Sequence, residues 1–179
     1  MTARPETARV LDLQPHPEGG WYRRIYASSV TLPHPTGTGH RPSATLIHYL
    51  LAPEERSQWH TVASDEIWLW RDGGPLALRL SPPGPAPTMV TEHLLGSHRF
   101  PGTELEVCVP AGHWQSASPA GDQEVLVSCL VTPGFDFADF TLLTPQHHTP
   151  GTEGEVSPTE PERTGREGNR LPNPVRTGR

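Results

Sequence analysis

The sequence predicts an all-β protein, and three observations carry this prediction. Apolar runs of strand length recur through the stretch from residue 45 to residue 143. Turn residues, mostly proline and glycine, separate these runs at intervals of about 8–12 residues, which is typical of sandwiches and barrels. Helical periodicity is nearly absent from the same stretch. Together these features favour a single β-sandwich or β-barrel.

Each predicted strand is an apolar run rich in β-branched or aromatic residues. Thr45–Leu51, with the sequence TLIHYLL, is the clearest, and it is followed by Ile67–Trp70, Leu76–Leu80, Met89–Leu95, Leu105–Val109, Val125–Val131 and Phe140–Leu143. The turns between them contain Gly73-Gly74, Pro82-Pro83-Gly84, Pro101-Gly102, Pro110-Ala111-Gly112, Pro119-Ala120-Gly121 and Pro133-Gly134. Only short helical segments are expected, near Thr7–Gln14 and Pro53–Arg56.

One change in composition divides the chain of 179 residues. Residues 9–144 are expected to form the folded domain, after a flexible N-terminus at residues 1–8. Residues 145–179 contain no aromatic residue and many Pro, Gly, Glu and Arg residues. Such a segment cannot bury enough apolar surface to offset its ordering entropy, so we expect a disordered tail.

The charge composition excludes several classes of function. The net charge is −6, which argues against nucleic acid or an anionic membrane as a partner. All 14 cationic residues are arginine, so chemistry that depends on a lysine Schiff base is excluded. No apolar stretch reaches the ~18 residues of a membrane-spanning helix, and we expect no secretory signal, because the segment MTARPETARV has no apolar core. We therefore expect a cytoplasmic protein in which Cys108 and Cys129 are buried, reduced thiols.

The segment WHTVASDEIWLWRDG, residues 59–73, contains the first candidate site. Side chains alternate between faces along a strand, so His60 and Val62 share a face, and Glu66 shares a face with Trp68. A hairpin with its turn near residues 63–65 would place His60 opposite Glu66. An imidazole beside a carboxylate is half of a metal site, an acid–base pair, or a hydrogen-bonded core histidine, and the spacing alone leaves all three open.

A second segment, VPAGHWQ at residues 109–115, extends this pattern, because both segments together resemble the cupin superfamily. That family carries His-x-His followed by Glu and Gly, and then Pro-x-Gly followed by a third His. Here Val62 replaces the second histidine and Gln115 the third. The resemblance thus implies a reduced metal site of His60, Glu66 and Gln115. Because glutamine oxygen is a weak ligand, we expect no required cofactor and at most a weakly bound divalent metal.

Four longer motifs resemble one uncharacterised family within the superfamily, called DUF985 or cupin type 5. They are LQPHPEGGWY, ASDEIW, VPAGHWQSA and VTPGFDFADF, which start at residues 13, 63, 109 and 131. The resemblance implies a double-stranded β-helix, or jelly roll, of the kind found in sugar-nucleotide epimerases. It also implies a homodimer, and it does not imply a reaction.

Further candidates for ligand binding lie within or beside these motifs. A pocket with aromatic walls and a few convergent polar groups suits a sugar-like or nucleotide-like molecule. The residues that could form such a pocket are Glu18, Trp59, Trp68, Trp70, His113 and Gln115. Structural packing is the competing role for each tryptophan.

Three hypotheses on function follow. The first is a metal-independent isomerase or epimerase acting beside a carbonyl, with His60 as the base, Glu66 as its partner, and a tyrosine (Tyr22, Tyr26 or Tyr49) as the acid. It rests on analogy with the jelly-roll epimerases. The second is a metal-dependent enzyme that uses His60, Glu66 and Gln115. The third is a binding module for a small ligand, without catalysis.

Overall fold

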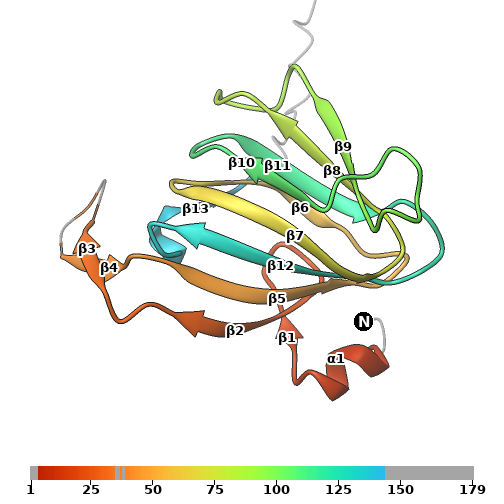
Figure 1. Ribbon diagram of the computed structural model, residues 1–179. Coiled ribbons are helices and arrows are strands. Elements are labelled where there is room, and N and C mark those ends of the chain that lie inside the picture. The colour runs from red at the N-terminus through yellow and green to blue at the C-terminus, as the bar shows by residue number, and fades with distance from the viewer. Residues whose placement is uncertain (1–3, 35–36, 38, 144–179) are drawn as a thin grey trace, which may run out of the picture. The chain divides into compact units, whose positions relative to one another are not determined.

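Antiparallel strands in two facing sheets make up nearly all of the regular structure (Figure 1). The structure is a computed structural model that describes residues 4–34, 37 and 39–143. The tail predicted for residues 145–179 lies outside the described residues. The two-sheet arrangement confirms the predicted all-β jelly roll.

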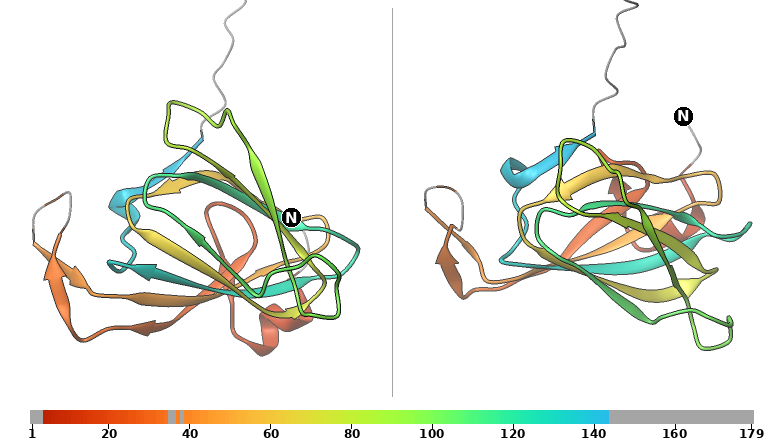
Figure 2. Two further views of the ribbon diagram at one scale, coloured as in Figure 1. Left: turned by 45° about the horizontal axis from the view of Figure 1, so that its top comes forward. Right: turned by 90° about the horizontal axis from the view of Figure 1, so that it is seen from above.

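The larger sheet has six strands and the smaller sheet five. In spatial order the larger contains β1 (Gln14–Pro15), β2 (Trp21–Ala27), β5 (Thr45–Leu51), β12 (Val125–Thr132), β7 (Asp65–Gly73) and β10 (Glu106–Val109). The smaller contains β13 (Phe140–Leu142), β6 (Ser57–Val62), β11 (Trp114–Pro119), β8 (Leu76–Ser81) and β9 (Thr91–Leu95). The hairpin of β3 (Thr31–Pro33) and β4 (His40–Pro42) projects from the body in Figure 2.

The strands predicted from apolar runs are present, but several boundaries differ. Strand β9 begins at Thr91 instead of Met89, and β10 begins at Glu106 instead of Leu105. The predicted strand Thr45–Leu51 coincides with β5. The strand predicted at Ile67–Trp70 is longer, because polar residues at both of its ends pair with β12 from Asp65 to Gly73. Backbone hydrogen bonds form the ladder, so side-chain hydropathy alone marks only the buried middle of such a strand.

The predicted hairpin between His60 and Glu66 is wrong. Strand β6 pairs with β11 and β13, whereas β7 pairs with β12 and β10, so the turn at residues 63–64 crosses from one sheet to the other. Alternation correctly gives the face of each strand, since both side chains are buried between the sheets. It does not specify which strand becomes the partner.

Side chains from both sheets interdigitate to form the main core. Its fully buried members come from seven strands and include Leu51, Trp68, Leu78, Leu95, Val109, Ala117 and Val127. Burying each leucine or valine contributes about 1.5–3 kcal/mol, so this cluster holds the two sheets together and fixes the positions of the polar side chains beside it.

A second, smaller apolar cluster lies where the N-terminal segment meets the larger sheet. It contains Ala8 of helix α1 (Glu6–Val10), together with Leu13 and Leu50. The range 1–8 predicted to be flexible therefore includes the first turn of a helix with a buried alanine. Among the described residues, no helix has the length and apolar character needed to cross a membrane.

Candidate functional site

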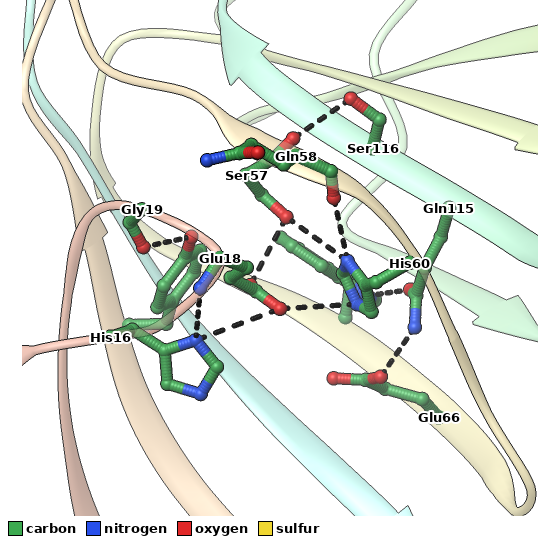
Figure 3. A network of polar contacts seen from close by, with 11 residues as sticks. His16, Glu18, Gly19, Ser57, Gln58, His60, Glu66, Gln115 and Ser116 are labelled. Carbon is green, nitrogen blue, oxygen red and sulfur yellow. Dashed lines mark hydrogen bonds and ion pairs between the residues drawn. The ribbon is translucent and has the colours of Figure 1, made fainter. Parts of the chain in front are cut away.

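A narrow pocket opens between the two sheets, next to the main core. Its lining side chains come from the loop before β2, from strands of both sheets and from the segment around the 3-10 helix η1 (Phe137–Asp139), and they include His16, Glu18, Tyr22, Arg24, His60, Glu66, Cys129, Phe135 and Phe140. We call this space the inner pocket. Figure 3 shows the network of polar side chains at its floor.

The loop from His16 to Gly20 carries two of these side chains inward. Gly19 and Gly20 have φ values of 109° and 68°, which L residues rarely adopt. A Cβ on Gly19 would lie 2.2 Å from the carbonyl oxygen of Arg56. The loop is fastened to β6, because the Gln58 N–H donates to the Glu18 carbonyl at 2.8 Å. Close packing of this backbone therefore sets the position of the Glu18 carboxyl group.

Glu18 and His60 contact each other at the floor of the inner pocket. The distance from Glu18 Oε2 to His60 Nε2 is 3.2 Å, and the Ser57 hydroxyl donates to Glu18 Oε1 at 3.0 Å (Figure 3). On the other side of the imidazole ring, His60 Nδ1 lies 2.8 Å from the Gln58 carbonyl oxygen. A carbonyl oxygen only accepts, so Nδ1 carries the proton and Nε2 presents its lone pair to Glu18 when His60 is neutral.

Burial keeps this pair uncharged. Desolvation raises the pKa of Glu18 from 4.5 to about 8, against the opposing effect of the nearby Ser57 and Tyr49 hydroxyl groups. Desolvation also lowers the pKa of His60, although the nearby Glu66 opposes the change. At pH 7 the carboxylic acid of Glu18 therefore donates to the neutral His60 ring.

His16 lies on the other side of Glu18. Its Nδ1 accepts from the Glu18 backbone N–H at 3.3 Å and is 3.6 Å from Glu18 Oε2. Burial, together with the positive charge that His60 can carry, lowers the pKa of His16 to about 4. Rings of Tyr22 and Phe140 pack edge-on against it, at centroid distances of 4.5 and 6.0 Å. His16 is therefore a neutral part of an aromatic wall at neutral pH.

Glu66 belongs to a separate hydrogen-bonded chain. The Trp68 indole N–H donates to Gln115 Oε1 at 2.8 Å, and Gln115 Nε2 donates to Glu66 Oε2 at 2.6 Å. Trp68 thus fixes which end of the amide faces Glu66. Desolvation raises the pKa of Glu66, and the nearby His60 and the Gln115 hydrogen bond oppose this effect.

These hydrogen bonds do not fit the metal site predicted from His60, Glu66 and Gln115. The amide oxygen of Gln115, its only metal-binding atom, accepts from Trp68, and its NH₂ group faces Glu66. Within the described residues, no group of three or more His, Cys, Asp or Glu side chains is placed to hold a metal ion. The arrangement is that of a hydrogen-bonded pocket floor.

The structure brings some of the sequence-predicted site residues together and places others elsewhere. Glu18, His60 and Glu66 line the inner pocket, and Gln115 and Trp68 support Glu66 from behind. The Tyr49 side chain is buried, and its hydroxyl donates to the Gly19 carbonyl at 2.8 Å, beside Glu18. Desolvation raises the pKa of Tyr49 well above its usual range.

Three predicted ligand-binding residues lie away from the inner pocket. Trp59 lines a groove outside the smaller sheet, because neighbouring residues in β6 face opposite ways and His60 faces inward. Trp70 packs against the core, and its indole N–H donates to the Gly74 carbonyl at 3.0 Å. His113 precedes β11 in a turn, and its Nδ1 is buried without a hydrogen-bond partner in the described part of the chain.

Tyr22, one of the three tyrosines considered as the acid, lines the inner pocket, whereas several other lining residues were not predicted as site residues: His16, Arg24, Cys129, Phe135 and Phe140. A signal for His16 exists, since it stands two residues before Glu18 and can share its face. Arg24 follows Tyr22 by two residues in β2, so alternation places both on one face, whereas Phe135 and Phe140 carry no comparable pattern. The prediction of two buried thiols is correct for Cys129 and wrong for Cys108, which is exposed at the edge strand β10; both are free.

A wider space adjoins the inner pocket, and we call it the outer recess; it is lined by Gln14, Tyr22, Arg23, Arg24, Phe135, Asp136 and Phe137. Tyr22, Arg24 and Phe135 line both spaces. The inner pocket has a free volume of about 30 Å³, and the recess about 410 Å³. One water needs about 10–15 Å³ on this scale, so the inner pocket accepts only a small chemical group.

Comparisons with known proteins agree with the motifs. A model of the family described as "Cupin superfamily (DUF985)" matches residues 6–143. A hypothetical protein from Leishmania major is 32% identical over 76% of this chain and 85% of its own, with a TM-score of 0.69. A protein of Shewanella oneidensis is also 32% identical, over 80% of this chain and 86% of its own, with a TM-score of 0.68. No curated protein matches the sequence.

More distant structures share only the fold. The oxalate decarboxylase of Lactobacillus farciminis is 14% identical, with a TM-score of 0.52 over 75% of this chain and 34% of its own. The capsular polysaccharide assembling protein CapF of Staphylococcus aureus is 16% identical, with a TM-score of 0.53 over 73% of this chain and 31% of its own. With the matched motifs, the two sheets and the two relatives at 32% identity in agreement, the chain belongs to the cupin superfamily, in the family DUF985.

Proposed function

We propose that this protein binds a small organic ligand with one end in the inner pocket and exchanges a proton with it through Glu18 and His60. The reaction class is that of an isomerase or epimerase acting beside a carbonyl. The observation that carries the proposal is the 3.2 Å contact between Glu18 Oε2 and His60 Nε2, at the floor of a pocket that both side chains line.

The acid–base properties of the pair suit proton transfer near neutral pH. A general acid–base catalyst works best when its pKa lies close to the working pH. Burial brings the pKa of Glu18 to about 8, whereas an exposed glutamate would be fully ionised. His60 Nε2 is the immediate acceptor for the Glu18 proton. A proton released by Glu18 can therefore pass to His60, or the reverse, when the ligand gains or loses a proton.

Tyr22 is the tyrosine that we propose as the partner acid of this reaction. It lines both the inner pocket and the outer recess. The hydroxyl of Tyr49 is engaged with the Gly19 carbonyl, and Tyr26 is 52% exposed on β2. Tyr49 then acts as a positioning residue that holds the loop bearing Glu18.

The test combines binding with isotope exchange. Keto sugars, sugar nucleotides and nucleosides are screened by thermal shift, since a ligand that binds the native state raises the melting temperature. Compounds that bind are incubated with the protein in D₂O, and NMR follows deuterium entry at the carbon beside the carbonyl. We expect exchange with the wild-type protein, and a loss of about 100-fold or more in Glu18→Gln, the scale of a general acid–base contribution.

Two controls make the result specific. Glu106→Gln removes an exposed carboxyl from β10 and leaves exchange unchanged if Glu18 acts as proposed. Tyr22→Phe should reduce exchange while binding persists. A ligand that binds the wild-type protein without any exchange would instead support the non-catalytic binding module.

A further inference from the structure

Arg24 stands at the junction of the inner pocket and the outer recess, and its side chain lines both. Arg23, its neighbour in β2, also lines the recess. Across the described residues, neither guanidinium forms an ion pair with a carboxylate. The entrance therefore carries positive charge that the described residues do not neutralise by direct pairing.

Among the described residues, no group that faces this entrance forms an ion pair with Arg24. Asp136 contributes one carboxylate to the recess, and its Oδ1 accepts from the Ala138 N–H at 2.9 Å. His16 is neutral, because burial brings its pKa to about 4. Further in, Glu18 is protonated at pH 7, with a pKa of about 8. Arg23 pairs with His48 in the sheet and its charge acts on that residue, on the face opposite to Arg24. The entrance therefore holds the Arg24 cation and the Asp136 carboxylate, which form no ion pair in the described part of the chain.

The two spaces differ in size, so each can hold a different part of a ligand. The inner pocket, at about 30 Å³, accepts a group no larger than a carbonyl or hydroxyl end. The recess, at about 410 Å³, falls within the ~300–1,000 Å³ of typical small-molecule sites. The bulk of a ligand therefore occupies the recess, beside Arg24, while one end reaches His60 and Glu18.

We propose that the ligand is an anion whose carboxylate or phosphate group binds Arg24 in the outer recess while its carbonyl end enters the inner pocket. This inference rests on the proposed function and names the ligand class for the same pocket. A guanidinium offers its N–H groups in a fork that matches both kinds of anion. The aromatic wall would also suit a cation through cation–π contacts, and the charge of Arg24 opposes that ligand.

Matched pairs of small keto compounds separate the anionic group from the carbonyl. Dihydroxyacetone phosphate is compared with dihydroxyacetone, and pyruvate with methyl pyruvate, by calorimetric titration at fixed ionic strength; tetramethylammonium represents the cation. We expect at least one anion to bind at least tenfold more tightly than its neutral partner, as a charge-assisted hydrogen bond to arginine allows. Which pair responds tells phosphate from carboxylate.

Variants assign the effect to Arg24. Arg24→Gln should weaken binding of the anion about tenfold or more and remove its preference over the neutral compound. Arg24→Lys keeps the charge without the fork and should retain part of the affinity. Arg99→Gln, which removes an exposed arginine from the turn at residues 97–100, is the matched control and should bind like the wild type.

The outcomes separate this inference from the proposed function. If the neutral compounds bind as tightly as the anions, or tetramethylammonium binds more tightly, the anionic class is wrong. If a neutral compound of this kind also undergoes Glu18-dependent deuterium exchange, the proposed function stands and only the anionic ligand class is wrong. An anion bound through Arg24 without exchange supports the ligand class and overturns proton transfer. If no anion binds at all, the inference fails.

Discussion

Replacing Glu18 with glutamine should remove a pH dependence of stability that the buried carboxyl imposes. The pKa of this group is about 8 in the folded protein and 4.5 when exposed. Between these values the folded state binds a proton that the unfolded state lacks, so the free energy of unfolding falls as pH rises. At 1.36 kcal/mol per pH unit, the full loss across this window is about 5 kcal/mol.

His16 works in the opposite direction over part of the same window. Its pKa is 6.5 when exposed and about 4 in the folded protein, so its contribution to stability grows as pH rises to 6.5. Between pH 4.5 and 6.5 the two groups largely cancel. From pH 6.5 to 8 only the loss from Glu18 remains, and it amounts to about 2 kcal/mol.

Urea unfolding followed by tryptophan fluorescence, from pH 5 to 9, measures this effect. With a urea m-value near 2 kcal/mol/M, the wild-type midpoint should fall by about 1 M between pH 6.5 and 8 relative to Glu18→Gln. The Glu106→Gln control removes an exposed carboxyl and should follow the wild-type curve. If the wild-type and Glu18→Gln curves run parallel over this range, Glu18 is not held in its protonated form and the acid–base argument fails.

Three further perturbations test the supporting structure. Gly19→Ala should destabilise the fold by more than Gly102→Ala, because both glycines have positive φ and only Gly19 has backbone within 4 Å of the added methyl; urea midpoints compare them. Trp68→Phe removes the donor to the buried Gln115 oxygen and should cost about 1–3 kcal/mol, measured the same way. The pair Val62→His and Gln115→His restores the histidines of the metal-binding cupin pattern and should confer roughly stoichiometric Ni²⁺ or Zn²⁺ binding in calorimetry; absence of binding would show that the barrel no longer supports that geometry.

Periodicity predicts the strands and which side chains of the site face inward, but it does not predict which strands pair. His60, Glu66 and Gln115 are buried as alternation requires. The same rule places Trp59 outside, since it is adjacent to His60, although its motif position favoured a ligand-binding role. The pairing of β6 with β11 and β13, across a turn that looks like a hairpin, depends on contacts distant in sequence.

The loop that carries Glu18 shows why the contact between Glu18 and His60 is harder to predict from the sequence. Its backbone at Gly19 and Gly20 follows no repeating pattern, and its position depends on close contact with β6. The sequence indicated Glu18 only as one of several candidates for ligand binding, whereas the side chain is 6% exposed and contacts His60. A strand pattern gives the direction of a side chain, and a loop side chain takes its direction from tertiary packing.

Two carboxyl groups, those of Glu18 and Glu66, lie buried near the His60 imidazole, at a site where the metal-binding cupin pattern has two further histidines. A metal ion would supply positive charge to stabilise carboxylates, and here Val62 and Gln115 stand where the metal-binding pattern has histidine. The charge must then be removed by protonation or balanced by hydrogen bonds, because a buried unpaired carboxylate is costly. Both routes are present: Glu18 holds its proton against His60, and Glu66 accepts from the oriented Gln115 amide. Burial therefore gives Glu18 a pKa near neutrality, which is the property that proton transfer to an organic ligand requires.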